Sequence, residues 1–74
     1  MIKAFFDVEG MMCSMCEAHI NDVVRKNVDI SKIKSKHRKK LTIVTLENKN
    51  DIDKIIESIE SLGYGCKLNK IEEI

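Results

Sequence analysis

Hydrophobic and polar positions alternate along the first stretch of the chain and then change to a helical spacing. Residues 2–8 place four apolar side chains on one face, namely Ile2, Ala4, Phe6 and Val8. Lys3 and Asp7 fall on the other face, and this alternation predicts a half-buried β-strand that ends at Gly10. A stripe of apolar side chains follows at helical spacing, formed by Ile20, Val23, Val24 and Val28. This stripe predicts an amphipathic helix over about residues 15–27.

The start of this helix carries a sequence signature. Ser14 is followed three positions later by Glu17, which fits the S-x-x-E pattern of a capping box. In a capping box the two side chains accept hydrogen bonds from main-chain N–H groups that the first turn leaves unpaired. We therefore expect Ser14 to cap the helix.

One predicted strand closes the first half of the chain, and another opens the second half at Leu41. Residues 30–36 can form a strand, although only Ile30 and Ile33 are large and apolar. Residues 41–46 read Leu-Thr-Ile-Val-Thr-Leu, which is rich in β-branched side chains and apolar on both faces. This composition predicts a strand in the interior of a sheet.

A second helix and a last strand follow. Asn50 or Asp51 can cap this helix. Its apolar stripe consists of Ile52, Ile55, Ile56, Ile59 and Leu62. Gly63 stands where a left-handed residue commonly ends a helix, and residues 65–70 are predicted to return as a short strand.

The order strand–helix–strand is thus used twice. Each helix has one apolar stripe and the strands mostly have one apolar face, so both helices can pack on one side of a four-stranded antiparallel sheet. This is the α+β, ferredoxin-like arrangement βαββαβ. No linker divides the chain and 74 residues are few for two domains, so we expect residues 1–74 to form a single domain.

Composition narrows the classes of function. The chain is 34% charged and no apolar run approaches the length of a membrane span, so we expect no membrane insertion. Residues 1–9 lack the basic start and apolar stretch of a signal peptide, which favours the cytoplasm. A net charge of +1 gives no support to a nucleic-acid partner. Three cysteines, an odd number, suit metal or redox chemistry better than a disulfide framework.

Sulfur is concentrated where the first strand meets the first helix. Residues 10–16 read Gly-Met-Met-Cys-Ser-Met-Cys, so Cys13 and Cys16 are separated by two residues. Both sulfurs can point to one position when the first lies in a loop and the second in the first helical turn. Unpaired N–H groups and the helix dipole favour negative charge there, so we expect a lowered pKa for the Cys16 thiol.

Thiolates are soft ligands, which restricts the metal ions that such a pair would hold. They select Cu(I), Zn(II), Cd(II) or Hg(II) over Mg(II) and Ca(II). A structural zinc site normally needs four protein ligands, whereas this chain has one C-x-x-C pair and no second. An open two-sulfur site is therefore favoured. Its near-linear geometry suits Cu(I) best and leaves room for a ligand from a partner.

At residues 10–16 the chain resembles a known family, because the segment matches the GMxCxxC signature of heavy-metal-associated domains. These domains include copper chaperones and the amino-terminal domains of heavy-metal-transporting P-type ATPases. The resemblance extends through the βαββαβ order to Gly63-Tyr64 after the second helix. It implies a partner that is such an ATPase or a similar metal-binding domain.

The resemblance also assigns roles to individual residues. It implies that Cys13 and Cys16 bind metal and that Met11 packs beneath the loop without acting as a ligand. It further implies that Tyr64 lies beside the site and shields the metal. One departure from the family pattern is Ser35, which stands where a core valine is common.

Further side chains near the pair have two interpretations each. His19 follows Cys16 by three residues on the same side of the helix, so it is either a third ligand or a solvent-exposed histidine. Met12 and Met15 could capture Cu(I) transiently or be plain loop residues. Cys66 in the last strand is expected to be a small buried hydrophobic residue, and metal ligation is its less favoured interpretation.

A basic run surrounds the predicted turn between the second and third strands. It consists of Lys32, Lys34, Lys36, Arg38, Lys39 and Lys40. Lysines on a strand discourage pairing between sheet edges, which makes a solvated face the simplest interpretation. No aromatic residue is interleaved for base stacking, so nucleic-acid binding is disfavoured. Docking onto an acidic partner domain is the alternative.

The leading hypothesis is a carrier of metal ions with no enzymatic activity, specifically a Cu(I) chaperone that hands copper to a transporter or regulator. The alternatives are a Zn(II), Cd(II) or Hg(II) domain and a metal-sensing module. The chain would then be a monomer or, with metal shared between two sites, a bridged dimer. A thiol–disulfide protein is a further rival, opposed by the absence of tryptophan and of the cis-proline that such sites use.

Overall fold

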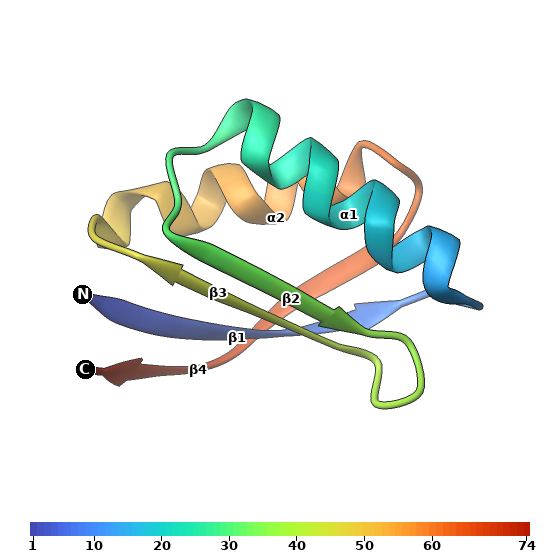
Figure 1. Ribbon diagram of the computed structural model, residues 1–74, viewed down its shortest axis with the longest axis horizontal. Helices are drawn as coiled ribbons and strands as arrows, with labels where there is room; N and C mark the ends of the chain where they lie inside the picture. Colours follow the sequence, from blue (N-terminus) through green and yellow to red (C-terminus); the bar gives the residue numbers. More distant parts are fainter.

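The computed structural model describes residues 1–74, which form four strands and two helices (Figure 1). The elements in chain order are β1 (Ile2–Glu9), α1 (Ser14–Asn27), β2 (Lys32–Lys36), β3 (Leu41–Leu46), α2 (Ile52–Glu60) and β4 (Gly65–Glu73). A 3-10 turn, Lys49–Asp51, leads into α2. The predicted βαββαβ order is therefore confirmed.

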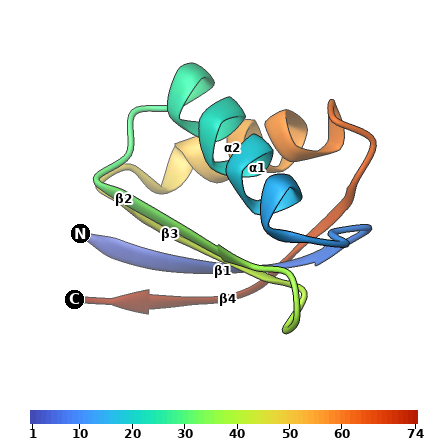
Figure 2. The same ribbon diagram turned by 45° about the vertical axis from the view of Figure 1, so that its right-hand side comes forward.

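The sheet has the strand order β2-β3-β1-β4, and every neighbouring pair is antiparallel. Both helices cover the same face, and the other face carries no helix (Figures 1 and 2). β3 lies between β2 and β1, so the strand predicted to be interior is interior. The ferredoxin-like α+β class is confirmed. No helix is both long and apolar enough to cross a membrane.

The core lies between the helices and the sheet. It comprises 14 buried apolar residues, among which the inward positions of β1 meet the apolar stripes of the two helices. Phe6, Ile20 and Ile55 are fully buried, one from β1 and one from each helix. The alternating apolar positions of β1 and the helically spaced apolar positions of α1 and α2 therefore pack into one core, because each element presents a single apolar face.

Three local predictions need correction at the ends of elements. Leu62 does not join the core and is 42% exposed, because α2 ends at Glu60 and the chain turns away through Gly63 at φ +94°. Asp51 is the N-cap residue of α2, as predicted, but its side chain makes no cap bond. Asn48 caps the preceding 3-10 turn by accepting a hydrogen bond from the main-chain N–H of Asn50 at 3.0 Å.

The last strand is longer than predicted, since β4 extends from Gly65 to Glu73. It pairs along the whole of β1, from Gly65 opposite Glu9 to Glu73 opposite Ile2, with an irregularity between Phe5 and Phe6. The polar end of β4 gives no alternating signal. The length of β4 is therefore set by its pairing with β1 and not by a pattern in its own sequence.

Ser35, which replaces a common core valine, is buried and bonded. Its hydroxyl donates to Asn21 Oδ1 at 2.8 Å and lies 3.1 Å from the hydroxyl of Thr42. These three side chains link α1 to β2 and β3. No buried side-chain nitrogen or oxygen lacks a partner, so the serine is accommodated by a complete polar network.

We predict that Ser35→Ala lowers the free energy of unfolding by about 1–2 kcal/mol, because Asn21 and Thr42 each lose a partner in a buried site. Urea denaturation measures the change. The matched control replaces the whole network with apolar side chains, as Asn21→Leu, Ser35→Val and Thr42→Val together. That triple variant is expected to recover most of the loss. A Ser35→Ala protein as stable as the wild type would show that these bonds contribute nothing.

Candidate metal centre

The two cysteines lie where the loop after β1 enters α1. Cys13 is the N-cap residue of α1, with extended backbone at φ −161° and ψ 178°. Its carbonyl oxygen accepts hydrogen bonds from the N–H groups of Cys16 at 3.1 Å and Glu17 at 3.4 Å. The predicted cap at Ser14 is therefore wrong by one position, because Ser14 already lies in the helix. The S-x-x-E pattern overlaps the C-x-x-C pattern, and Cys13 is the N-cap residue in place of Ser14.

This shift gives the cysteine spacing a physical meaning. Cys13 and Cys16 occupy the N-cap and third helical positions, the two positions that a capping box uses. The helix turn between them brings the two thiols together, and Cys16 receives a hydrogen bond from the Cys13 side chain. Cys13 is exposed and Cys16 is half-buried, so a bound ion would be reachable from solvent on one side.

The surroundings of Cys16 stabilise its thiolate. The main-chain N–H of Met12 is the largest cause and the Tyr64 hydroxyl the next, and together they lower the pKa of the Cys16 thiol from 9.0 to about 7 despite opposing desolvation. The predicted lowering of this pKa at the helix start is thus found. Half of the Cys16 side chains are then thiolate near neutral pH, which is the form that binds metal.

Tyr64 lies beside the thiol pair, as the family resemblance implies. Its hydrogen bond to Cys16 is the first cause of a raised pKa for the phenol. Its ring lies against Gly10, where an added Cβ would stand 3.0 Å from Tyr64 Cδ1. Gly10 also has φ +104°, a conformation that favours glycine. A side chain at position 10 would therefore displace the ring that covers Cys16.

Of the three methionines at residues 11–15, Met11 is buried in the core, and Met12 and Met15 are exposed to solvent. Met11 is 6% exposed and belongs to the core, so it fastens the loop to the domain. Met12 and Met15 are 82% and 66% exposed. Their thioethers stand in solvent on either side of Cys13, and only Met11 has a packing role.

His19 and Cys66 are not gathered with the thiol pair. His19 is exposed on α1, and no group of three His, Cys, Asp or Glu side chains is placed to hold one ion. Cys66 is half-buried against the core opposite Val8, and desolvation raises its pKa to about 12. It therefore stays a neutral thiol. The residues that could hold a metal ion are Cys13 and Cys16.

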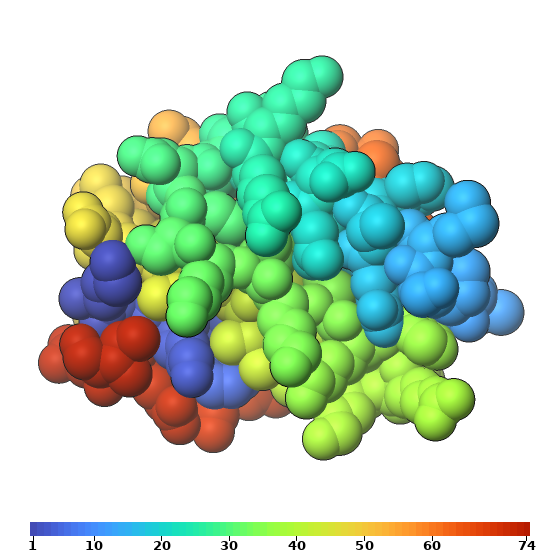
Figure 3. Space-filling view, in the orientation of Figure 1, coloured from blue at the N-terminus to red at the C-terminus, as the bar shows by residue number.

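One contact at this end of the molecule is invisible to local sequence patterns. The Glu17 carboxylate accepts hydrogen bonds from the main-chain N–H of His37 at 2.7 Å and from the His37 ring. These bonds lower the pKa of Glu17. The turn between β2 and β3 is thereby held against the helix that carries Cys16, and in Figure 3 this turn (yellow-green) and the thiol loop (blue) share one end. Twenty residues separate the partners, so only the folded topology brings them together.

The family is established by comparison with known proteins. A model of the heavy-metal-associated domain matches residues 5–65, and the chain belongs to this family. It is 34% identical over 73 residues to a copper-transporting ATPase of Helicobacter pylori, a match that covers 97% of this chain and 10% of that protein. The chain spans about a tenth of the length of the curated relatives it matches.

Solved structures agree with this assignment. The yeast copper transporter domain Ccc2a, solved in apo and Cu(I)-loaded states, superposes with a TM-score of 0.87 at 28% identity, covering 97% of this chain and 100% of that one. The N-terminal domain of ZntA in its Zn(II) form gives a TM-score of 0.89 at 17% identity, with 97% of each chain covered. That second likeness is one of fold alone. The resemblance expected from residues 10–16 is confirmed.

We predict that alkylation by iodoacetamide distinguishes the cysteines. Cys16 is expected to react with a midpoint near pH 7, losing reactivity as the pH falls below that value, because its thiolate is stabilised. Tyr64→Phe keeps the ring over Gly10 but removes one hydrogen bond, so the midpoint should move upward. Peptide mass spectrometry follows each cysteine separately, and Cys66 should stay slow throughout. A Cys16 midpoint near the ordinary value of 9.0 would contradict this account.

Proposed function

We propose that this domain binds one Cu(I) ion between Cys13 and Cys16 and passes it to a similar two-cysteine site on a partner. The observation that carries the proposal is the placement of both cysteines at the start of α1, where the pKa of the Cys16 thiol is lowered to about 7. Family membership supports binding of a soft metal ion by this loop.

The choice of Cu(I) rests on the number of ligands. Two thiolates and no third clustered donor satisfy an ion that accepts near-linear coordination, whereas Zn(II) prefers four ligands. Relatives named for copper transport support the same choice. Zn(II), Cd(II) and Hg(II) are the competing ions, since all of them bind thiolate.

The exposure of the two thiols suggests how transfer proceeds. Cys13 is exposed, so an incoming thiolate can approach the ion from that side while Cys16, covered by Tyr64, still holds it. In the shared three-coordinate intermediate the ion is bound to Cys13, Cys16 and the partner's first cysteine. The bond from Cys13 to the ion then breaks, and a second partner cysteine binds the ion as Cys16 leaves. Each step exchanges one sulfur ligand for another, and no catalytic group is required. The domain acts as a carrier and not as an enzyme.

A copper-transporting P-type ATPase, or a heavy-metal-associated domain of one, is the partner that this chemistry fits. The similar ATPase of Helicobacter pylori contains a segment alignable with nearly the whole of this chain. A free chaperone and a domain attached to a transporter would use the same loop in the same way. The cytoplasm is the expected location, because a reducing compartment keeps both thiols free.

We predict that the apo domain binds Cu(I) in a one-to-one ratio under anaerobic conditions. Replacement of both ligands, Cys13→Ser with Cys16→Ser, should abolish binding in competition with a Cu(I) chelator, because no other thiol pair exists. Cys66→Ser is the matched control and should bind as the wild type does. Undiminished Cu(I) binding by the double variant would overturn the site assignment, and tighter competition by Zn(II) would overturn the choice of metal.

We predict that His19→Ala changes Cu(I) affinity by less than about twofold, since less than ~0.5 kcal/mol is then at stake. His19 is exposed and outside any three-residue cluster. X-ray absorption spectroscopy of the loaded protein provides an independent measurement, with sulfur neighbours alone expected. A nitrogen neighbour that disappears in His19→Ala would make the histidine a third ligand.

The thiol–disulfide alternative is distinguished by a separate assay. A Cys16 pKa of about 7 would suit a redox thiol as well as a metal ligand. The carrier proposal expects no acceleration of insulin reduction by the apo domain in the presence of dithiothreitol. Turnover that depends on both Cys13 and Cys16 would favour the redox function.

A further inference from the structure

The face of the sheet that carries no helix has a regular arrangement of charge. The strand register defines rows across this face, and each row begins with a lysine of β2: Lys32, Lys34 and Lys36. The row of Lys32 continues through Thr45 of β3 and Lys3 of β1 to Glu72 of β4, whose carboxylate pairs with Lys70. The lysines of β1 and β2 alternate with buried neighbours, so they share the uncovered face.

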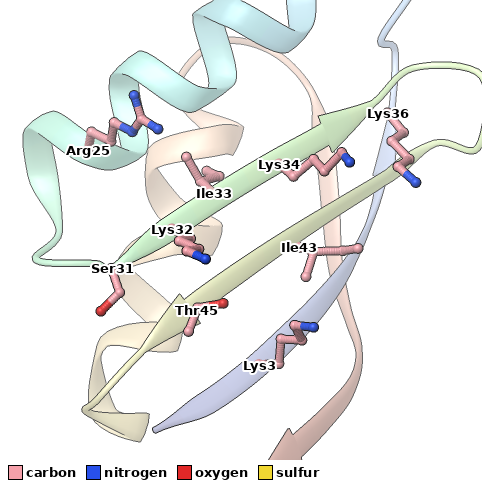
Figure 4. A pocket seen from close by; sticks show the side chains of 9 residues that line it. All are labelled: Lys3, Arg25, Ser31, Lys32, Ile33, Lys34, Lys36, Ile43 and Thr45. Carbon is pink, nitrogen blue, oxygen red and sulfur yellow. The ribbon is translucent and has the colours of Figure 1, made fainter. Parts of the chain in front are cut away.

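A hollow of about 480 Å³ lies along the free edge of β2 and is lined from both sides of the sheet (Figure 4). Five cationic side chains line it: Lys3, Arg25, Lys32, Lys34 and Lys36. Figure 4 shows that they come from β1, α1 and β2. The remaining lining residues are isoleucines, a serine and a threonine, and no carboxylate is among them. The hollow therefore collects positive charge without an internal counter-charge.

None of the five cations is paired elsewhere. The four ion pairs of the domain involve His37, Lys40, Lys54 and Lys70. Asp7, which lies in the Lys36 row between Leu41 of β3 and Lys67 of β4, is held by Asn69 at 3.1 Å. Like charges brought together without partners repel one another, so this arrangement costs stability in the free domain. An anionic ligand would relieve that repulsion.

The free edge of β2 indicates the shape of such a ligand. β2 is hydrogen-bonded only to β3, so its other edge can accept a further strand. Its lysines recur at every second residue, which spaces them by roughly 7 Å along an extended chain. Carboxylates at every second position of an added strand have the same spacing. The lysines of β2 repel the β2 edge of a second copy of this chain. The same lysines would favour an added strand that carries carboxylates.

We propose that the β2 edge and its cationic hollow bind an extended acidic segment of a protein, one with carboxylates at alternate positions. The segment adds a strand beside β2 and its carboxylates pair with Lys32, Lys34 and Lys36. Arg25 and Lys3 flank the same hollow from α1 and β1. This surface contains neither Cys13 nor Cys16, so it extends the proposed function to a second contact with a partner.

Two other anionic partners fit this face less well. Single-stranded nucleic acid is typically bound by stacking its bases on aromatic side chains, but Phe5, the aromatic side chain on this face, is half-buried and lies under Lys70 Nζ at 4.7 Å from the ring centroid. A membrane surface needs apolar side chains to insert, and the exposed large apolar residues do not line the hollow. A protein segment can pair with both the lysines and the free edge.

The test uses the apo 74-residue chain and a capped synthetic peptide of alternating glutamate and threonine. At about 20 mM salt we expect binding with amide shifts concentrated in β2, and weakening at about 200 mM salt as screening increases. A peptide with glutamine in place of glutamate is expected not to bind. The variant Lys32→Glu, Lys34→Glu and Lys36→Glu should lose at least about tenfold in affinity.

The matched control reverses the same number of charges elsewhere, as Lys39→Glu, Lys49→Glu and Lys54→Glu, and should stay within about twofold of the wild type. A glutamine version of the β2 variant tests folding: it should lose binding without a lower melting temperature, because no ion pair is broken. Equal loss in the control would reduce the effect to net charge and overturn the proposal. So would failure to bind the peptide, or tighter binding of single-stranded DNA or anionic vesicles through these lysines. Cu(I) affinity of the β2 variant, expected unchanged, separates this outcome from a failure of the metal site.

Discussion

The first turn of α1 is the constraint on which the metal loop depends. The carbonyl of Cys13 accepts the N–H groups of Cys16 and Glu17, and this turn sets the distance between the two thiols. The loop before it is fixed by Met11 in the core and by the ring of Tyr64 over Gly10. A pair of soft ligands is thus held by ordinary helix geometry, and the same unpaired N–H groups that need a cap favour the thiolate.

The rest of the fold supports this turn from two sides. The sheet positions β1 so that its end delivers the loop to the helix, and Glu17 ties the β2–β3 turn to the same helix through His37. The buried network of Asn21, Ser35 and Thr42 joins α1 to the sheet further along. Metal chemistry at one end therefore rests on contacts distributed over most of a small domain, which has few core residues to spare.

The net charge of the chain does not describe how charge is distributed over the folded surface. A net charge of +1 suggests a surface without preference for anions. In the folded domain the unpaired cations gather along β2, while acidic residues such as Asp53 and Glu57 lie on α2. Net charge is a sum over all residues and does not say where each charge lies on the folded protein. A surface with strong local preference can therefore belong to a nearly neutral protein.

The sequence by itself determined the order of elements, the interior place of β3 and the family, because alternation, helical spacing and the GMxCxxC segment are local patterns. It did not determine the cap of α1, where two overlapping four-residue motifs competed, nor the length of β4 and the exposure of Leu62. The structure placed the Tyr64 hydroxyl against Cys16, as the resemblance implied. Only the tertiary structure paired Glu17 with His37 and gathered Arg25 with the lysines of β1 and β2. These contacts join residues far apart in the chain, so their geometry exists only once the sheet and helices have packed together.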